Sequence, residues 1–261
     1  MNQPLAYVHP GAKIAKNVVI EPFATIHNNV VIGEGTWIGS NVTIMEGARI
    51  GKNCNIFPGA VISAIPQDLK FQDEETVAVI GDNTTLREYV TINRGTVDRG
   101  KTVIGKNCLI MAYCHVAHDC LVGDNCIFSN NSTLAGHVTI GDFVILAGMT
   151  AIHQFASVGN HAFITGGSLV RKDVPPFVKG AREPLSYVGI NSIGLRRRGF
   201  TPEKIREIQN IYRLLYQKNY NTTQAAGIIE AEMEATPERD EILQFIKNSK
   251  RGIMKGYFSS N

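Results

Sequence analysis

The sequence predicts an all-β solenoid, a parallel β-helix, followed by a small α-helical domain, and three observations support this prediction. Large apolar residues recur every six positions from Val8 to Val170, where 25 of 28 such positions are apolar. The position two residues earlier is nearly always small. The composition then changes near Pro175-Pro176, from Gly, Asn, Val and Ile to Glu, Lys and Gln. A six-residue period matches neither the period of a helix nor that of a simple strand.

The repeat explains how the coil closes. Residues two apart in a strand point to the same face, so each repeat places one large and one small side chain inward. A corner after every six residues gives a triangular coil of 18 residues, and coils stack about 4.8 Å apart, like neighbouring strands. About nine coils fit between Val8 and Val170.

Glycine directly follows the large inward residue at eight positions, where we expect it to turn the corner at positive φ. These positions are Gly33, Gly39, Gly51, Gly81, Gly105, Gly123, Gly141 and Gly159. The three exceptions to the repeat, Asp68, Glu74 and Asp98, predict segments that loop out near residues 64–78 and 93–102. Long loops on a regular solenoid are usually functional.

All five cysteines fall in the small inward column, which predicts buried, reduced thiols. They are Cys54, Cys108, Cys114, Cys120 and Cys126. Their odd number argues against a disulfide framework. They occupy separate core positions and form no paired zinc-ligand motif.

Length and composition describe a chain with one large domain and one small one. The 261 residues are 44% hydrophobic with a net charge of +3, which excludes disorder as the main state. Apolar runs are far shorter than the roughly 18 residues of a spanning helix. Residues 1–10 show no signal peptide, so we expect a cytoplasmic protein without membrane insertion.

The net charge is unevenly distributed, with −3 over residues 1–170 and +6 over residues 171–261. We expect the β-helix in residues 1–190 and the helical domain in residues 191–261. Thr201-Pro202-Glu203 and Thr236-Pro237-Glu238 have the cap, proline and acidic first turn of helix starts. A further helix is expected from Thr223 to Ala235.

The 18-residue coil brings four histidines to one edge of the prism. Stepping up by one coil from His118 leads to Gly136, and a second step leads to Gln154. His115, His137 and His153 lie beside this column. His118 near a corner can face outward, and with Asp119 it could act as a general base, while Gly136 could offer a backbone N–H to an oxyanion.

Two other interpretations of the histidines remain open at this point. They could be solvated turn residues, or three of them could hold zinc. No serine has a plausible nucleophile context, which favours direct attack by a substrate hydroxyl. The basic run 196–198 could clamp phosphates, but without interleaved aromatics or a recognised motif it does not indicate nucleic-acid binding.

A set of motifs in fixed order gives the chain a resemblance to a known family. The motifs are Gln67-Asp68-Leu69-Lys70, Asn93-Arg94-Gly95-Thr96, His115 to Cys120, Leu134 to Val138, Gly148 to Phe155, Asp173 to Pro176 and Arg197 to Phe200. Together with the hexapeptide solenoid, they resemble the UDP-N-acetylglucosamine acyltransferases of lipid A biosynthesis over essentially the whole chain.

The resemblance implies a homotrimer of left-handed β-helices with active sites between subunits. It implies transfer of an (R)-3-hydroxyacyl chain from acyl carrier protein to the glucosamine 3-hydroxyl of UDP-N-acetylglucosamine, with no cofactor and no metal. The implied catalytic residues are His118 as general base, Asp119 as its partner and Gly136 as oxyanion donor. The implied substrate contacts are Asp68, Lys70, His115, His137, His153 and Gln154, with Asn191, Arg197 and Arg198 at the nucleotide and phosphates.

Other members of this class of fold supply the alternatives. One is the N-acyltransferase of the same pathway, which has a uridine-binding domain before its coils, whereas here the repeat begins at Val8. Another is a zinc-dependent trimer of the carbonic anhydrase type, and a third is a non-catalytic scaffold. Ser192-Ile193 departs from the family, which can carry an acidic residue after the position of Asn191. The sequence leaves open the acyl-chain length and whether the acceptor carries a 3-hydroxyl or a 3-amino group.

Overall fold

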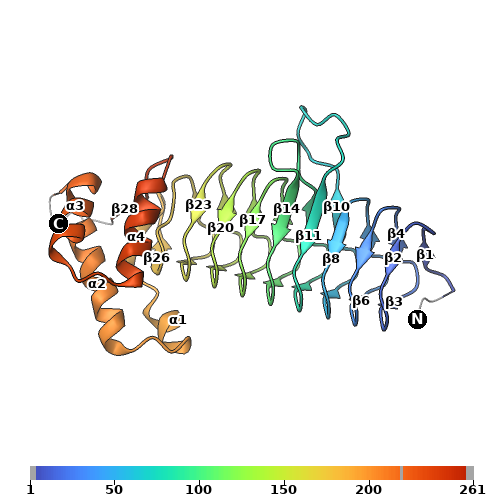
Figure 1. The fold of residues 1–261 in the computed structure, drawn as a ribbon, viewed down its shortest axis with the longest axis horizontal. Coiled ribbons are helices and arrows are strands. Elements are labelled where there is room, and N and C mark those ends of the chain that lie inside the picture. Colours follow the sequence, from blue (N-terminus) through green and yellow to red (C-terminus); the bar gives the residue numbers. More distant parts are fainter. Residues whose placement is uncertain (1–3, 218–219, 257–261) are drawn as a thin grey trace.

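The computed structural model describes residues 4–217 and 220–256, and the described residues form a left-handed parallel β-helix with four helices at its C-terminal end (Figure 1). Three sheets make the faces of the prism. This confirms the predicted fold class.

Each sheet receives every third strand of the solenoid. The first sheet contains β1 (Tyr7–Val8), β4 (Thr25–Ile26), β7 (Thr43–Ile44), β10 (Val61–Ala64), β13 (Thr91–Asn93), β16 (His115–Val116), β19 (Thr133–Leu134), β22 (Ala151–Ile152) and β25 (Leu169–Val170). The second contains β2 (Lys13–Ile14), β5 (Val31–Ile32), β8 (Ala48–Ile50), β11 (Val77–Ile80), β14 (Lys101–Ile104), β17 (Leu121–Val122), β20 (Thr139–Ile140) and β23 (Ser157–Val158). The third contains β3 (Val19–Ile20), β6 (Trp37–Ile38), β9 (Asn55–Ile56), β12 (Thr85–Leu86), β15 (Leu109–Ile110), β18 (Ile127–Phe128), β21 (Ile145–Leu146), β24 (Phe163–Ile164), β26 (Val178–Ala181), β27 (Ser186–Ile190) and β28 (Lys255–Gly256).

The strand register confirms that 18 residues make one coil around the site. His115 pairs with Thr133, and Thr133 pairs with Ala151. Two intervals in the first sheet are longer, because Val61 pairs with Thr91 and Thr91 pairs with His115. The extra residues form the loops between β10 and β11 and between β13 and β14, which project together from one edge (Figure 1).

The glycines after the inward residues do not turn the corners, so that prediction was wrong. None of the eight has a positive φ; the left-handed residue lies two positions further on, as at Asn53 and Asn125. Glycine is required instead because coils approach closely. A Cβ on Gly81 would lie 2.5 Å from the carbonyl carbon of Gly105, a distance that real Cβ contacts do not reach.

The five cysteines are buried and free, as predicted. Burial raises the pKa of Cys114 to about 11 and that of Cys120 to about 12. Because all five thiols are buried, and the thiolate is the reactive form, we expect a thiol reagent at pH 8 to modify less than one thiol per native chain within minutes, and all five after denaturation. Rapid labelling of two or more thiols in the native chain would contradict this packing.

The C-terminal part contains α1 (Ser192–Arg197), α2 (Pro202–Gln217), α3 (Thr222–Glu232) and α4 (Pro237–Asn248). The last three coincide with the predicted helices within a few residues. α1, a six-residue helix capped by the Asn191 side chain, was not predicted from the sequence. β28 returns to pair with β27, so the end of the described chain joins the third sheet. No helix of the described residues is long and apolar enough to cross a membrane.

Candidate active site

His118 and Asp119 occupy the corner between β16 and β17, where the first and second sheets meet. His118 Nδ1 lies 2.8 Å from Asp119 Oδ2. When Nδ1–H donates to this carboxylate, the lone pair of Nε2 is free to accept a proton. The ring was expected to face outward; it lies at the corner but is only 7% exposed.

Gly136 lies directly against the His118 ring, as the 18-residue step predicts. A Cβ at this position would be 2.6 Å from His118 Cε1 and 2.7 Å from Nε2, so a side chain here would overlap the imidazole. Among the described residues, the Gly136 N–H donates no hydrogen bond. The corner therefore combines a basic ring nitrogen and an unused backbone donor.

The Asp119 carboxylate is fully buried and held by the loop between β13 and β14. The Thr96 hydroxyl donates to Asp119 Oδ2 at 2.7 Å, and the Thr96 N–H donates to Oδ1 at 3.1 Å. The Arg99 N–H also donates to Oδ1, at 3.2 Å. The roles of Thr96 and Arg99 were not predicted; the signals were the interruption of the repeat at Asp98 and the motif Asn93-Arg94-Gly95-Thr96.

These hydrogen bonds control the charge of Asp119. Burial alone would raise the pKa of this carboxyl, but the hydrogen bonds from His118 and Thr96 outweigh it and hold the pKa below its usual value. A depressed pKa stabilises the fold above the unfolded-state pKa of about 3.9, and that stabilisation is lost as the pH falls through the folded-state pKa.

We therefore expect Asp119→Asn to lower the free energy of unfolding by about 1–3 kcal/mol at pH 7, because it removes a charged, hydrogen-bonded acceptor from a buried site. Denaturant unfolding of both proteins at pH 7 and at pH 3 measures the difference. It should shrink towards acid, because below the unfolded-state pKa of about 3.9 the stabilisation that comes from the depressed pKa begins to be lost. An equal difference at both pH values would show that charge is not what Asp119 contributes.

Three further predicted residues surround this pair. His137, one coil above, has Nδ1 3.1 Å from Asp98 Oδ2, and its ring stacks on Phe155 at 4.5 Å. His115 Nδ1 lies 2.8 Å from the Thr91 hydroxyl. Asp68, on the loop between β10 and β11, has Oδ2 3.9 Å from His118 Nε2. Burial, with a smaller contribution from His118, lowers the pKa of His115 and favours its neutral form.

Other predicted residues lie at the same edge with fewer contacts. His153 is exposed, and its Nδ1 is 3.0 Å from the carbonyl oxygen of Gln154. Gln154 itself is half-buried at the next corner up. Lys70 is exposed on the same loop as Asp68. This edge thus brings together the acid–base pair, the free N–H and several polar side chains.

The predicted nucleotide contacts lie elsewhere on the chain. Asn191 and Arg197 line a cavity of about 370 Å³ beside the third sheet. Asn191 caps α1 through Oδ1 and donates from Nδ2 to the His161 carbonyl oxygen. Arg198 donates to the carbonyl oxygen of Phe143, at the corner between the second and third sheets. One chain alone does not bring these residues to His118.

The geometry also gives the zinc alternative a structural basis. His118, Asp119 and His137 each offer a ligand atom, and these atoms lie within 4.8 Å of one another. Asp119, however, already accepts hydrogen bonds from Thr96, Arg99 and His118. A metal at this position would have to replace some of those bonds.

Family models match three parts of the chain. Residues 173–254 match UDP N-acetylglucosamine O-acyltransferase domain 2, residues 101–136 match the bacterial transferase hexapeptide repeats, and residues 2–106 match the GMPPB C-terminal domain.

Curated and solved relatives point the same way. The chain is 44% identical to an acyl-[acyl-carrier-protein]–UDP-N-acetylglucosamine O-acyltransferase of Myxococcus xanthus, over 74% of this chain and 76% of the relative. It is 52% identical to a UDP-N-acetylglucosamine acyltransferase structure from Bacteroides fragilis, which covers 98% of this chain and 100% of that one with a TM-score of 0.96. The Francisella novicida enzyme is 42% identical, covering 100% and 96%, with the same TM-score. The chain belongs to the UDP-N-acetylglucosamine O-acyltransferase family.

Proposed function

We propose that this chain transfers an (R)-3-hydroxyacyl group from acyl carrier protein to the glucosamine 3-hydroxyl of UDP-N-acetylglucosamine, the first step of lipid A biosynthesis. The proposal places the reaction in the cytoplasm and requires no cofactor. The observation that carries it is the position of His118 Nε2 against Gly136, with Nδ1 bonded to Asp119. A relative over 74% of the chain is named acyl-[acyl-carrier-protein]–UDP-N-acetylglucosamine O-acyltransferase, and a solved relative over 98% of the chain is named UDP-N-acetylglucosamine acyltransferase.

The geometry suggests direct transfer without an acyl-enzyme. His118 Nε2 takes the proton from the sugar hydroxyl as its oxygen attacks the thioester carbon. The Gly136 N–H donates to the oxygen of the tetrahedral intermediate. As the C–S bond breaks, the carrier thiolate leaves and takes the proton from His118, whose charged form Asp119 stabilises. Positioning supplies much of the rate, because a thioester is already activated.

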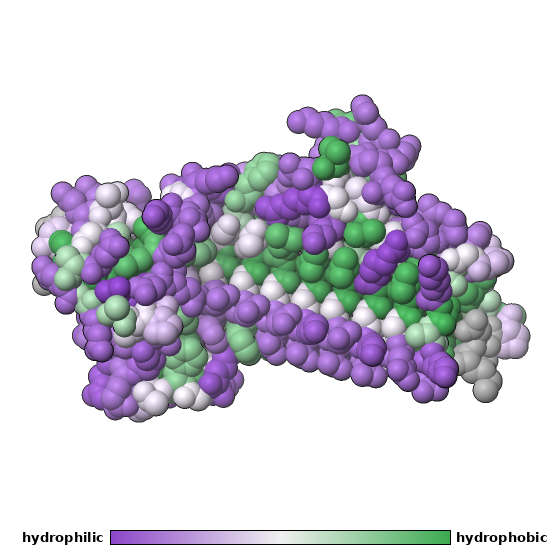
Figure 2. All heavy atoms as spheres, viewed as in Figure 1, coloured by the Kyte–Doolittle hydropathy of each residue, from purple (hydrophilic) through white to green (hydrophobic). Residues whose placement is uncertain are grey.

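A homotrimer would complete this site. Asn191, Arg197 and Arg198 lie away from the His118 corner of their own chain, so a neighbouring subunit is the natural source of the nucleotide and phosphate contacts. Figure 2 shows an apolar band along one side of the solenoid, which a second copy could cover. Outward positions of the second sheet include Val31, which is exposed, and the half-buried Val79, Val103 and Leu121. In this arrangement Asp68, Lys70, His115, His137, His153 and Gln154 would contact the sugar or the acyl donor.

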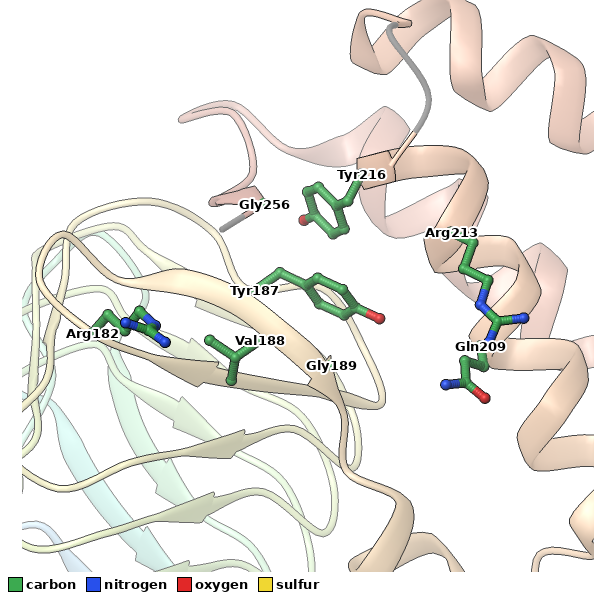
Figure 3. A pocket seen from close by; sticks show the side chains of 8 residues that line it. All are labelled: Arg182, Tyr187, Val188, Gly189, Gln209, Arg213, Tyr216 and Gly256. Carbon is green, nitrogen blue, oxygen red and sulfur yellow. The ribbon is translucent and has the colours of Figure 1, made fainter. Parts of the chain in front are cut away.

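The carrier protein would dock on the basic C-terminal part. A cavity of about 350 Å³ between β27 and α2 is lined by Arg182 on one side and by Arg213 and Gln209 on the other, together with the rings of Tyr187 and Tyr216 (Figure 3). A second cavity of about 460 Å³ adjoins it at Gly189 and Gln209 and adds Arg196 and Arg206. Among the described residues, no carboxylate lines either cavity, which suits an acidic partner.

Reversing one of these charges tests the docking surface. We expect Arg213→Glu to raise the KM for the acyl carrier protein about tenfold at low salt, with little change in the KM for the nucleotide sugar. Lys16→Glu changes the same charge on an exposed residue near the start of the solenoid and is the matched control. Equal effects of the two variants would show that only net charge matters.

The reaction itself is tested with purified protein, UDP-N-acetylglucosamine and a series of hydroxyacyl carrier proteins of different chain lengths, with mass spectrometry of the products. An O-acylated nucleotide sugar is the expected product, and the series identifies the preferred chain length. A parallel reaction with the 3-amino analogue identifies the acceptor. Absence of any acylated product at every length would overturn the proposal, and stoichiometric zinc in the purified protein would favour the alternative of a zinc-dependent enzyme of the carbonic anhydrase type.

A further inference from the structure

The loop between β13 and β14 does more than interrupt the solenoid. Its residues Thr96 and Arg99 direct their backbone N–H groups at the Asp119 carboxylate, and the Thr96 hydroxyl adds a shorter bond. Arg99 also donates from its guanidinium to the Asp119 carbonyl oxygen at 2.7 Å. One short loop therefore contacts both the side chain and the backbone of the same residue.

The carboxylate is saturated by these contacts. Oδ1 accepts from the N–H groups of Thr96 and Arg99, while Oδ2 accepts from the Thr96 hydroxyl and faces His118 Nδ1. An ionised carboxylate has about four acceptor positions, so rotation about the Cβ–Cγ bond of Asp119 would break several hydrogen bonds at once. The loop therefore fixes the orientation of the Asp119 carboxylate, and with it the direction from which Oδ2 meets His118 Nδ1.

We propose that Thr96 is a positioning residue for the acid–base pair: its hydroxyl fixes Asp119 Oδ2, and through it the orientation of the His118 ring. Thr96 is 7% exposed, and its hydroxyl also accepts weakly from the Asp98 N–H at 3.3 Å. The bond to Oδ2 is the shortest that the loop makes to the carboxylate, as expected for a hydroxyl donor to a charged acceptor. The inference rests on the proposed function, because His118 must be the base for its orientation to affect the rate.

Two substitutions of Thr96 test the role of its hydroxyl. Thr96→Val keeps the shape and the backbone N–H but removes the hydroxyl, whereas Thr96→Ser keeps the hydroxyl. We expect the valine variant to lose about tenfold in kcat with a KM for the nucleotide sugar within twofold of the native value, and the serine variant to restore kcat. The KM for the nucleotide sugar should change little, because Thr96 acts on His118 only through its hydrogen bonds to Asp119.

Thr84→Val is the matched control. Thr84 is fully buried, and its hydroxyl accepts from the Cys108 N–H and donates to the Gly105 carbonyl oxygen at a different corner of the prism. The Thr84→Val variant loses the same hydroxyl from another buried position, so any loss that comes from general destabilisation should appear here too. A kcat loss of equal size in Thr84→Val and Thr96→Val would overturn the positioning role.

A spectroscopic measurement separates this proposal from the proposed function. In protein labelled with ¹⁵N-histidine, the His118 Nδ1–H bonded to a carboxylate should give a downfield proton signal that is absent in His118→Ala. We expect the signal to broaden or move upfield in Thr96→Val and to persist in Thr96→Ser and Thr84→Val. An unchanged signal together with unchanged kcat in Thr96→Val overturns the inference. Failure of the native protein to transfer any acyl group overturns the proposed function instead.

Discussion

Replacing His118 by alanine should lower kcat for acyl transfer by at least about 10²-fold, the range expected when a general base is removed. His118 is the residue whose Nε2 is free while Nδ1 is bonded to Asp119. The KM for UDP-N-acetylglucosamine should change little, because the ring acts mainly when the proton moves. Initial rates at saturating acyl carrier protein measure both constants.

His27→Ala provides the control for this variant. His27 follows β4, so it lies at the same edge of the prism but four strands away from β16 in the first sheet. Strands at about 4.8 Å spacing place it roughly 19 Å from the site. Its removal should leave kcat unchanged. If His118→Ala retained more than a third of the native kcat while remaining folded, the ring would not be the base.

The solenoid was predictable because its coil converts sequence distance into spatial distance. A large side chain every six residues can only be buried if the chain turns a corner every six residues, which is why Ile26, Ile44 and Ile62 all lie fully buried in the first sheet. The same rule placed Gly136 against His118. These predictions needed no knowledge of any particular side-chain contact.

The loops could not be predicted in the same way. Residues 94–100 leave the coil, so the spacing rule gives no neighbour for Thr96, and its hydrogen bond to Asp119 depends on how one irregular segment folds back. The eight glycines show a related limit. Their spacing was read as a sign of turning corners, whereas glycine is required there because neighbouring coils approach closely. The left-handed residue lies two positions further on, and in five of the eight cases it is an asparagine, which tolerates that conformation.

The predicted nucleotide contacts follow neither from the spacing of the coil nor from the fold of its loops. Asn191 and Arg198 make hydrogen bonds within their own chain, to His161 and Phe143. Burial, followed by the charge of Arg198, lowers the pKa of His161 to about 4, so this ring stays neutral in the aromatic stack between Phe143 and Phe177. A pattern in one chain cannot show what its neighbour contributes.

Gly136→Ala should be nearly as damaging to the rate as loss of the base, although it keeps the backbone N–H. The new Cβ would lie 2.6 Å from His118 Cε1, closer than real Cβ contacts come. The ring cannot simply swing away, because Asp119 is held by Thr96 and Arg99. We expect kcat to fall about 10²-fold, as for a misplacement of about 1 Å, and overpacking to cost about 1–3 kcal/mol of stability.

Gly148→Ala is the matched control, since a Cβ there meets its nearest atom at 3.4 Å, an ordinary contact. It should leave rate and melting temperature unchanged. The decisive comparison is a double-mutant cycle measured by thermal unfolding. If the clash with the imidazole is the cause, adding Gly136→Ala to His118→Ala should cost almost no stability, because the overlapping ring is gone. A full additive loss in the double variant would mean that the alanine strains the coil itself and that the contact between Gly136 and His118 is not what requires glycine.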